Sequence, residues 1–279
     1  MKLLACGDSW VWGDELVDPE IEPIPMMRIP GGGFHLHLKP ENQAYRMKHR
    51  YVNQLAEKIN AEVVDLSQCS ASNNAIVRRL MDYLSEEDYL FGRDTSDLFV
   101  SIGWTSPERT EFYYKKKWGG DNWLDFGPWT LGRSHDNEDV DEFFKIYVEN
   151  FYHPGEYLRR WILQIWQTEQ MLKSLNINYV MHQAFYHHHM QTIRQWIDKR
   201  YQEDIKNTIT LSDKKLWDSI DETRFMHKNH PETGTAHHYM LSQADWDPDK
   251  VFIEFHPSAY GHKLWADHIY EYCKEHNIL

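Results

Sequence analysis

The chain has few cysteines, too few basic residues to balance its acidic ones, and no long apolar run. Its 279 residues include three cysteines, Cys6, Cys69 and Cys273. Three thiols cannot form a disulfide framework, and no pair of them has the spacing of a metal site, which favours a reducing compartment. No stretch reaches the ~20 apolar residues that a membrane helix needs. We therefore expect a soluble protein without a membrane span.

Basic residues are in deficit. The chain holds 30 Lys and Arg against 43 Asp and Glu, so its formal net charge is −13 at pH 7. Nucleic acids and anionic membrane surfaces attract an excess of Lys and Arg, and this balance argues against both partners. The sequence leaves the oligomeric state open.

We also expect no secretory signal. The run Leu3-Leu4-Ala5-Cys6 resembles a bacterial lipoprotein cleavage site. A signal peptide, however, needs a charged start and a longer apolar stretch than these few residues provide. We expect a cytoplasmic protein.

Short apolar runs alternate with amphipathic segments along much of the chain, which is typical of a parallel sheet covered by helices. Four runs are predicted to be strands: 2–6, 62–66, 97–103 and 178–184. Four segments are predicted to be helices: one ending near Ile59, one capped by Ser72 or Asn73, one carrying the apolar positions of 158–175, and one over 258–276. The pattern predicts one α/β domain, spanning 1–279.

The alternation breaks in three places, which we interpret as insertions at about 17–42, 104–141 and 187–249. The first is rich in proline and glycine and predicts a surface loop. The second carries several tryptophans and glycines beside the expected site. The third contains a predicted helix around Ile193, Trp196 and Ile197, followed by a polar, histidine-rich stretch without an assigned structure.

Two short motifs at opposite ends of the chain carry the chemistry. Gly7-Asp8-Ser9-Trp10 follows the first predicted strand, and His256-Pro257 leads into the last predicted helix. A neutral hydroxyl is a poor nucleophile unless a base lies beside it. Because the carboxyl ends of strands in an open α/β sheet converge on one crevice, Ser9 and His256 can meet there.

Together with the loops after the second and third strands, these motifs make the chain similar to the SGNH, or GDSL, hydrolases. The resemblance rests on Gly7-Asp8-Ser9, on the small-residue loop Ser70-Ala71-Ser72-Asn73, on the glycine of Gly103-Trp104-Thr105, and on His-Pro and Gly-His near the end. It implies a flavodoxin-like, doubly wound parallel sheet in a three-layer α/β/α arrangement. It also implies that Ser9 is the nucleophile and His256 the general base.

The same resemblance implies an oxyanion hole. The backbone N–H of Ser9 is one donor, and Ser70 stands where the family has a glycine whose N–H is the second. The family's third donor is an asparagine in a Gly-x-Asn loop, but this chain has Gly103-Trp104-Thr105. Either the Thr105 hydroxyl or the Asn73 amide could replace it, and we favour Asn73 because its amide is chemically equivalent.

The orienting acid is not identified by the pattern. The family's acid lies three residues before the histidine, and this position is Ile253. The alternatives are Glu254, an aspartate such as Asp247, or a Ser-His dyad with a backbone acceptor. Such an acid fixes the tautomer of the imidazole and stabilises the imidazolium.

Other polar residues near the motifs have structural interpretations. We expect Asp8 to bond loop N–H groups, and His262 and Trp265 to have core or capping roles on the last helix. Trp104 lies just after the third strand, at the expected crevice, and Arg109 is a candidate anchor for an anionic substrate group.

Seventeen histidines raise the question of a metal. Adjacent histidines on an extended segment, such as those at 187–189, point to opposite faces and do not form a compact site. Histidines that could still gather are His182, His187, His227, His230, His237 and His238. We favour a solvated polar loop and predict no metal and no cofactor.

The sequence therefore predicts a serine esterase or deacylase that acts on small-molecule or glycan esters through an acyl-enzyme. Two alternatives stay open. One is a catalytically degenerate scaffold that binds a glycan or a protein. The other is an acyltransferase that uses the same residues.

Overall fold

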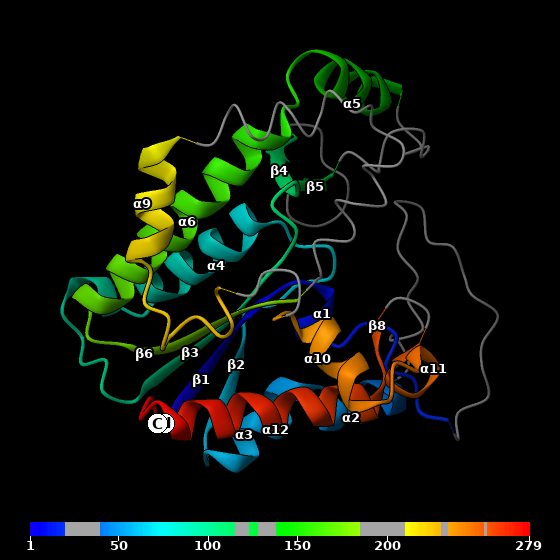
Figure 1. Ribbon diagram of the computed structural model, residues 1–279, viewed down its shortest axis with the longest axis vertical. Coiled ribbons are helices and arrows are strands. Elements are labelled where there is room, and N and C mark those ends of the chain that lie inside the picture. Colours follow the sequence, from blue (N-terminus) through cyan, green and yellow to red (C-terminus); the bar gives the residue numbers. More distant parts are fainter. Residues whose placement is uncertain (20–39, 115–122, 128–137, 185–209, 230–233, 254–255) are drawn as a thin grey trace.

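A four-stranded parallel sheet lies at the centre of the computed structural model (Figure 1), which describes residues 1–19, 40–114, 123–127, 138–184, 210–229, 234–253 and 256–279. The strand order is β2-β1-β3-β6. The strands are β1 (Lys2–Gly7), β2 (Glu62–Asp65), β3 (Leu98–Trp104) and β6 (Asn178–Gln183). All four predicted strands are confirmed, each with ends within one residue of the predicted run.

The strand order places the carboxyl ends of the strands at one edge of the sheet. Gly7 of β1 pairs with Gly103 of β3, and Gly103 pairs in turn with His182 of β6. Beyond β6, Met181 forms a parallel bridge with Phe225, where a fifth strand would lie. The order matches the flavodoxin-like arrangement 2-1-3-4-5, so the predicted fold class is confirmed.

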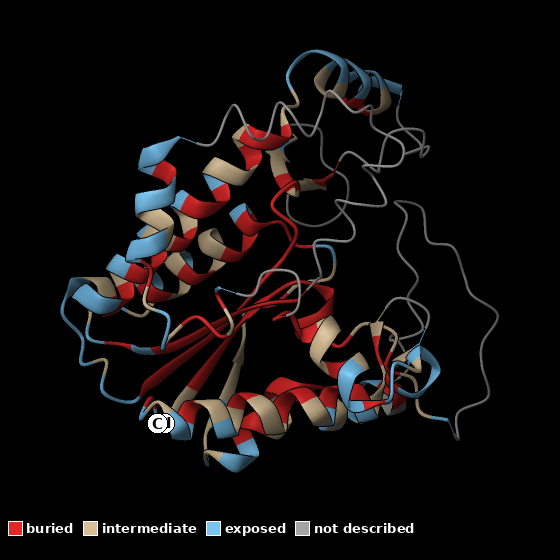
Figure 2. Cartoon of the chain, viewed as in Figure 1, coloured by how far each residue is buried: buried red, intermediate tan, exposed pale blue. Residues whose placement is uncertain are grey.

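Helices cover both faces of the sheet, and they divide the core into two layers (Figure 1). On one face lie α2 (Pro40–His49), α3 (Tyr51–Lys58) and α12 (Ala259–Glu275); on the other lie α4 (Asn73–Glu86), α6 (Pro154–Ser174) and α9 (Leu211–Ser219). Successive residues of β1 point to opposite faces, so Leu3 joins the first layer and Leu4 the second. β1, β3 and β6 are buried along most of their length, whereas β2 is only partly buried (Figure 2).

The predicted insertion at 104–141 contains regular structure that the sequence did not indicate. A hairpin of β4 (Thr110–Tyr113) and β5 (Trp123–Phe126) precedes α5 (Glu138–Asn150). The two pack through aromatic rings, with Phe126 stacked on Phe144 at a centroid distance of 4.2 Å. This small third core lies beside the main sheet and is separate from its two layers.

The predicted insertion at 187–249 also contains helices where it is described. They are α9, α10 (Ala236–Gln243) and the first residues of α11 (Pro248–Val251). The short elements elsewhere in the chain are α1 (Ser9–Trp12), a 3-10 turn (Tyr89–Phe91), β7 (Phe252–Ile253) and β8 (His256–Pro257). The helix predicted around Ile193 and most of the proline-rich loop lie outside the described residues. A single domain remains a prediction.

The helix caps follow the sequence signals. Ser72 caps α4 by accepting a hydrogen bond from the N–H of Ala75, and Ser258 caps α12 by accepting one from Gly261.

None of the described helices combines the length and apolar character that a membrane crossing requires.

Candidate active site

Ser9 lies at the carboxyl edge of the sheet because β1 turns directly into α1. The Asp8 side chain caps this short helix by accepting a hydrogen bond from the N–H of Trp10 at 3.0 Å. Val11 then packs down onto the strand ends. A Cβ atom at Gly7 would lie 2.0 Å from Val11 Cγ2, and one at Gly103 would lie 2.7 Å from it. Both glycines therefore serve the close approach of α1, which presents the Ser9 hydroxyl at the sheet edge.

His256 reaches Ser9 from the other end of the chain. Its Nε2 lies 2.9 Å from Ser9 Oγ, a hydrogen-bond distance, across 247 positions of sequence. The short β7–β8 pairing and the start of α12 hold this segment. A Cβ atom at Gly261 would lie 2.4 Å from the Val251 carbonyl oxygen, so only glycine allows α12 to begin this close to α11.

A carboxylate lies against the other ring nitrogen of His256. Glu15 Oε2 is 2.8 Å from His256 Nδ1, an ion-pair contact that is off the direction of an aligned hydrogen bond. The aspartate named as an alternative, Asp247, caps α11 by accepting a hydrogen bond from the N–H of Asp249. Glu254 lies outside the described residues. Sequence reasoning missed Glu15, although two acidic residues follow α1 within six positions of Ser9.

The turn that carries Glu15 has an uncommon backbone. Gly13 has φ 78° and Glu15 has φ 62°, both in the left-handed region. For a residue other than glycine this region costs roughly 1–2 kcal/mol and persists only where surrounding contacts impose it. The N–H groups of Gly13 and Asp14 both donate to the Ser9 carbonyl, which folds the turn back onto the nucleophile.

Helix α2 holds this turn from outside. The Asn42 amide donates to the Leu16 carbonyl at 3.2 Å and accepts from the Asp18 N–H at 2.9 Å. Arg46 donates to the Trp12 carbonyl at 2.8 Å, and its guanidinium lies 3.8 Å from the centre of the Trp12 ring. The residues contacted by α2 lie before and after Asp14 and Glu15 in the chain. Helix α2 therefore holds the turn that carries these two acidic residues.

The loop after β2 has the glycine-like backbone that the resemblance implied. Ser70 has φ 65°, although it carries a side chain. Among the described residues, the backbone N–H groups of Ser9 and Ser70 have no acceptor. Neither N–H group is therefore engaged by another described residue.

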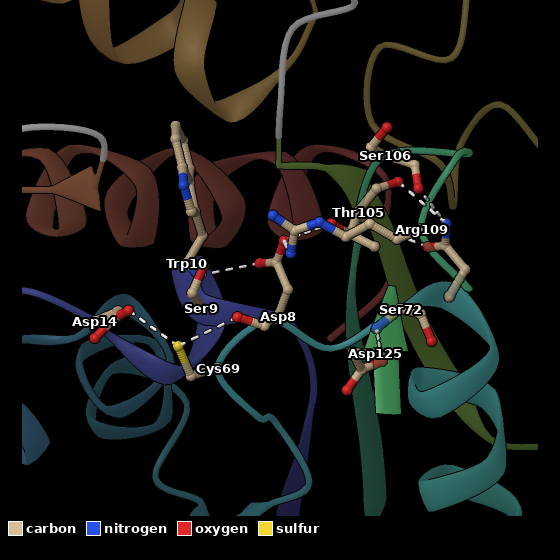
Figure 3. A network of polar contacts seen from close by, with 12 residues as sticks. Asp8, Ser9, Trp10, Asp14, Cys69, Ser72, Thr105, Ser106, Arg109 and Asp125 are labelled. Carbon is tan, nitrogen blue, oxygen red and sulfur yellow. Dashed lines mark hydrogen bonds and ion pairs between the residues drawn. The ribbon is translucent and has the colours of Figure 1, made fainter. Parts of the chain in front are cut away.

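The two side chains considered for the third donor are engaged with the scaffold. The Asn73 amide donates to the Thr105 carbonyl at 3.3 Å and the Ser106 carbonyl at 2.9 Å, and accepts from the Thr105 N–H at 3.1 Å. The Thr105 hydroxyl donates to Asp8 Oδ2 at 2.6 Å (Figure 3). Asn73 thus holds the loop after β3 in place, and Thr105 holds the Asp8 carboxylate in place. Their predicted oxyanion roles stay untested.

Asp8 is fully buried and is contacted by donors from two segments, α1 and the loop between β3 and β4. Besides Trp10 and Thr105, Arg109 Nη1 lies 3.5 Å from its Oδ2 (Figure 3). The structural role expected for Asp8 fits these contacts, and the positive charge of Arg109 faces this buried carboxylate. The Trp104 side chain is fully buried within the core, so it does not line the surface of the site.

Two further ionisable side chains border the loop after β2. Cys69 Sγ donates to Asp14 Oδ2 at 3.0 Å, and burial beside this carboxylate raises the pKa of the thiol. Asp125 of the hairpin accepts the Ser72 N–H at 2.8 Å (Figure 3). Burial raises the pKa of Asp125 to about 6, against the opposing effect of this hydrogen bond.

Two other histidines lie behind the site, in the core. His262 Nδ1 accepts the Tyr51 N–H at 3.2 Å, and His182 Nε2 lies 3.1 Å from the Tyr51 hydroxyl. Burial lowers the pKa of both histidines to about 3, so both are neutral at physiological pH. The core role expected for His262 fits this position. Across the described parts of the chain, no three His, Cys, Asp or Glu side chains gather as a metal site would require.

The site thus brings a hydroxyl, an imidazole and a carboxylate into contact, in that order. An imidazole that contacts a serine through Nε2 and a carboxylate through Nδ1 can take the hydroxyl proton and be stabilised as imidazolium. A second carboxylate also approaches the ring: Asp14 Oδ2 lies 3.7 Å from His256 Nε2.

Comparison with known proteins gives one family match. A model described as "Family of unknown function (DUF6071)" matches residues 35–278. No curated protein matches the sequence.

Two solved structures show distant similarity. A psychrotrophic esterase EstA from Pseudoalteromonas sp., inhibited by monoethylphosphonate, is 10% identical, with 98% of this chain and 97% of that one covered and a TM-score of 0.45. A G-D-S-L family protein from Desulfitobacterium hafniense DCB-2 is 13% identical, with 100% and 99% covered and a TM-score of 0.39. Both similarities are low, and the interpretation of the site rests on its own geometry.

Proposed function

Because the chain belongs to the DUF6071 family, whose function is unknown, we propose its function from its own site: it is a serine hydrolase of carboxylic esters. The single observation that carries the proposal is the contact chain from Ser9 Oγ through the His256 ring to Glu15, with separations of 2.9 and 2.8 Å. A hydroxyl, a base and an orienting acid in this order are what acyl transfer to serine requires.

In the first half of the reaction, Ser9 Oγ attacks the ester carbonyl carbon while its proton passes to His256 Nε2. The resulting tetrahedral oxyanion collapses, the bond to the leaving oxygen breaks, and Nε2 returns the proton to this oxygen. An alcohol leaves and an acyl ester on Ser9 remains. Glu15 stabilises the imidazolium that exists between the two proton transfers.

In the second half, water replaces the alcohol. His256 Nε2 takes a proton from the water as its oxygen attacks the acyl carbon, and then protonates Ser9 Oγ as the acyl–oxygen bond breaks. A carboxylic acid leaves and the enzyme is restored. An acyltransferase would differ only in using a sugar or other hydroxyl in place of water.

The oxyanion in both halves needs donors directed at one point, each of which lowers the barrier by about 3 kcal/mol. We assign this role to the backbone N–H groups of Ser9 and Ser70. Their lack of acceptors among the described residues supports the assignment, and so does the left-handed backbone of Ser70.

The test is hydrolysis of p-nitrophenyl acetate by purified protein and its Ser9→Ala variant. We expect the substitution to reduce kcat/KM by at least about a thousandfold, because no other group takes over the nucleophile's role. Ser242→Ala, which removes an exposed hydroxyl on α10, is the matched control and should retain full activity. Equal activity of Ser9→Ala and wild type would reject the proposal.

A further inference from the structure

We propose that Asp14 makes the site select esters by the charge of their alcohol portion, favouring cationic alcohols and disfavouring anionic ones. The inference rests on the proposed function and extends it to a class of substrate. Its basis is the position of a second carboxylate, distinct from Glu15, next to the atom that must protonate the leaving group.

The geometry of proton return places Asp14 beside the leaving group. Asp14 Oδ2 lies 3.7 Å from His256 Nε2, the same nitrogen that contacts Ser9 Oγ. The leaving oxygen must come within hydrogen-bond distance of Nε2 to receive its proton. The alcohol portion of any ester therefore passes next to the Asp14 carboxylate, whereas the Glu15 carboxylate lies on the far side of the ring.

Two hydrogen bonds to the side chain and one from the backbone hold Asp14 in this position. Its Oδ1 accepts the Glu15 N–H at 3.2 Å, its Oδ2 accepts the Cys69 thiol at 3.0 Å, and its backbone N–H donates to the Ser9 carbonyl at 2.9 Å. Figure 3 shows Asp14 and Cys69 joined below Ser9. A carboxylate that is held in place, with its side chain 13% exposed, presents a fixed charge to the substrate.

Neighbouring cations reduce this effect without reversing it. Arg46 is within electrostatic range of Asp14, but its guanidinium lies over the Trp12 ring and donates to the Trp12 carbonyl. Arg109 faces the buried Asp8 carboxylate. Two unit charges a few ångströms apart near a protein surface still change a rate constant by about tenfold.

The experiment compares three acetate esters that differ in charge at one position: 3-(trimethylammonio)phenyl acetate, its neutral isostere 3-tert-butylphenyl acetate, and 3-carboxyphenyl acetate. For each ester, kcat/KM is measured with wild type, Asp14→Asn and Asp94→Asn. Asp94 is exposed and precedes β3 at the opposite edge of the sheet, so its variant has the same net charge as Asp14→Asn without a change at the site. Ratios between variants cancel the intrinsic reactivity of each ester.

We expect Asp14→Asn to lower the cationic-to-neutral ratio of kcat/KM about tenfold and to raise the anionic-to-neutral ratio by a similar factor. Asp94→Asn should leave both ratios unchanged. Ratios that Asp14→Asn does not alter, in a protein that hydrolyses the neutral ester, would overturn the inference and leave the proposed function intact. A wild type that hydrolyses none of the three esters would contradict both.

Discussion

His256 and His262 stand six positions apart, yet the fold gives them opposite surroundings. His256 contacts a serine hydroxyl and lies between two carboxylates at the sheet edge. His262 is fully buried on α12, where its Nδ1 accepts the Tyr51 N–H. Burial lowers the pKa of His262 to about 3. The comparison teaches that acidic neighbours and partial access to solvent, more than the presence of an imidazole, distinguish the proposed general base from a core residue.

The largest expected effect is the difference in activity between two variants that carry the same substitution, one at His256 and one at His262. His256→Asn removes Nε2, the atom proposed to take the Ser9 proton, and should reduce kcat/KM for p-nitrophenyl acetate by at least about a thousandfold. His262→Asn keeps an acceptor for the Tyr51 N–H and should retain most of the activity. Steady-state kinetics of the two purified variants measure this difference. Similar losses at both positions would remove the distinction drawn between them.

The next effect concerns the acid. Glu15→Gln keeps the size of the side chain but removes the charge that stabilises the imidazolium, and we expect kcat to fall by roughly a hundredfold with little change in KM. Asp247→Asn, at the alternative acid considered from sequence, is the control and should behave as wild type. The reverse ranking of the two variants would assign the orienting role to Asp247.

The smallest effect is the contribution of the buried His262 to the free energy of unfolding. The folded-state pKa of His262, about 3, lies below the unfolded value near 6.5, so the unfolded chain takes up the proton first. Stability from the neutral imidazole is present above pH 6.5 and is lost as pH falls toward the folded pKa. Between pH 7 and pH 5 this loss amounts to about 2 kcal/mol.

Asparagine does not titrate, so His262→Asn should lose about 2 kcal/mol less unfolding free energy than wild type over the same pH interval. Urea unfolding at the two pH values measures both slopes, and Asp94→Asn is the comparison for a surface change. Parallel slopes for wild type and His262→Asn would show that His262 does not stay neutral in the core.

Much of the sheet was predictable because its strands are short, apolar and evenly interrupted. The hydrophobic runs that gave β1, β3 and β6 depend on local composition alone. The β4–β5 hairpin was not predicted, because its aromatic residues pack against α5, an element further along the chain. Its stability comes from contacts that no local pattern shows.

The site divides in the same way. Ser9 and His256 could be found because both lie beside predictable elements, at the end of the first strand and before the last helix. The contact of Glu15 with His256 could not be predicted from the sequence. It depends on a left-handed turn and on the hydrogen bonds that Asn42 and Arg46 of α2 make to the backbone of that turn. The hydrogen bonds of the Asn73 amide to two carbonyls of the loop after β3 could not be read from the sequence either, and its predicted oxyanion role stays a prediction.

The most direct measurement of the central claim is mass spectrometry of the protein after reaction with a fluorophosphonate. If Ser9 and His256 act together, the phosphonyl adduct will be found on the peptide that contains Ser9, and His256→Asn will abolish it while His262→Asn will not. An unlabelled Ser9 in the folded wild-type protein, or equal labelling in His256→Asn, would contradict the account.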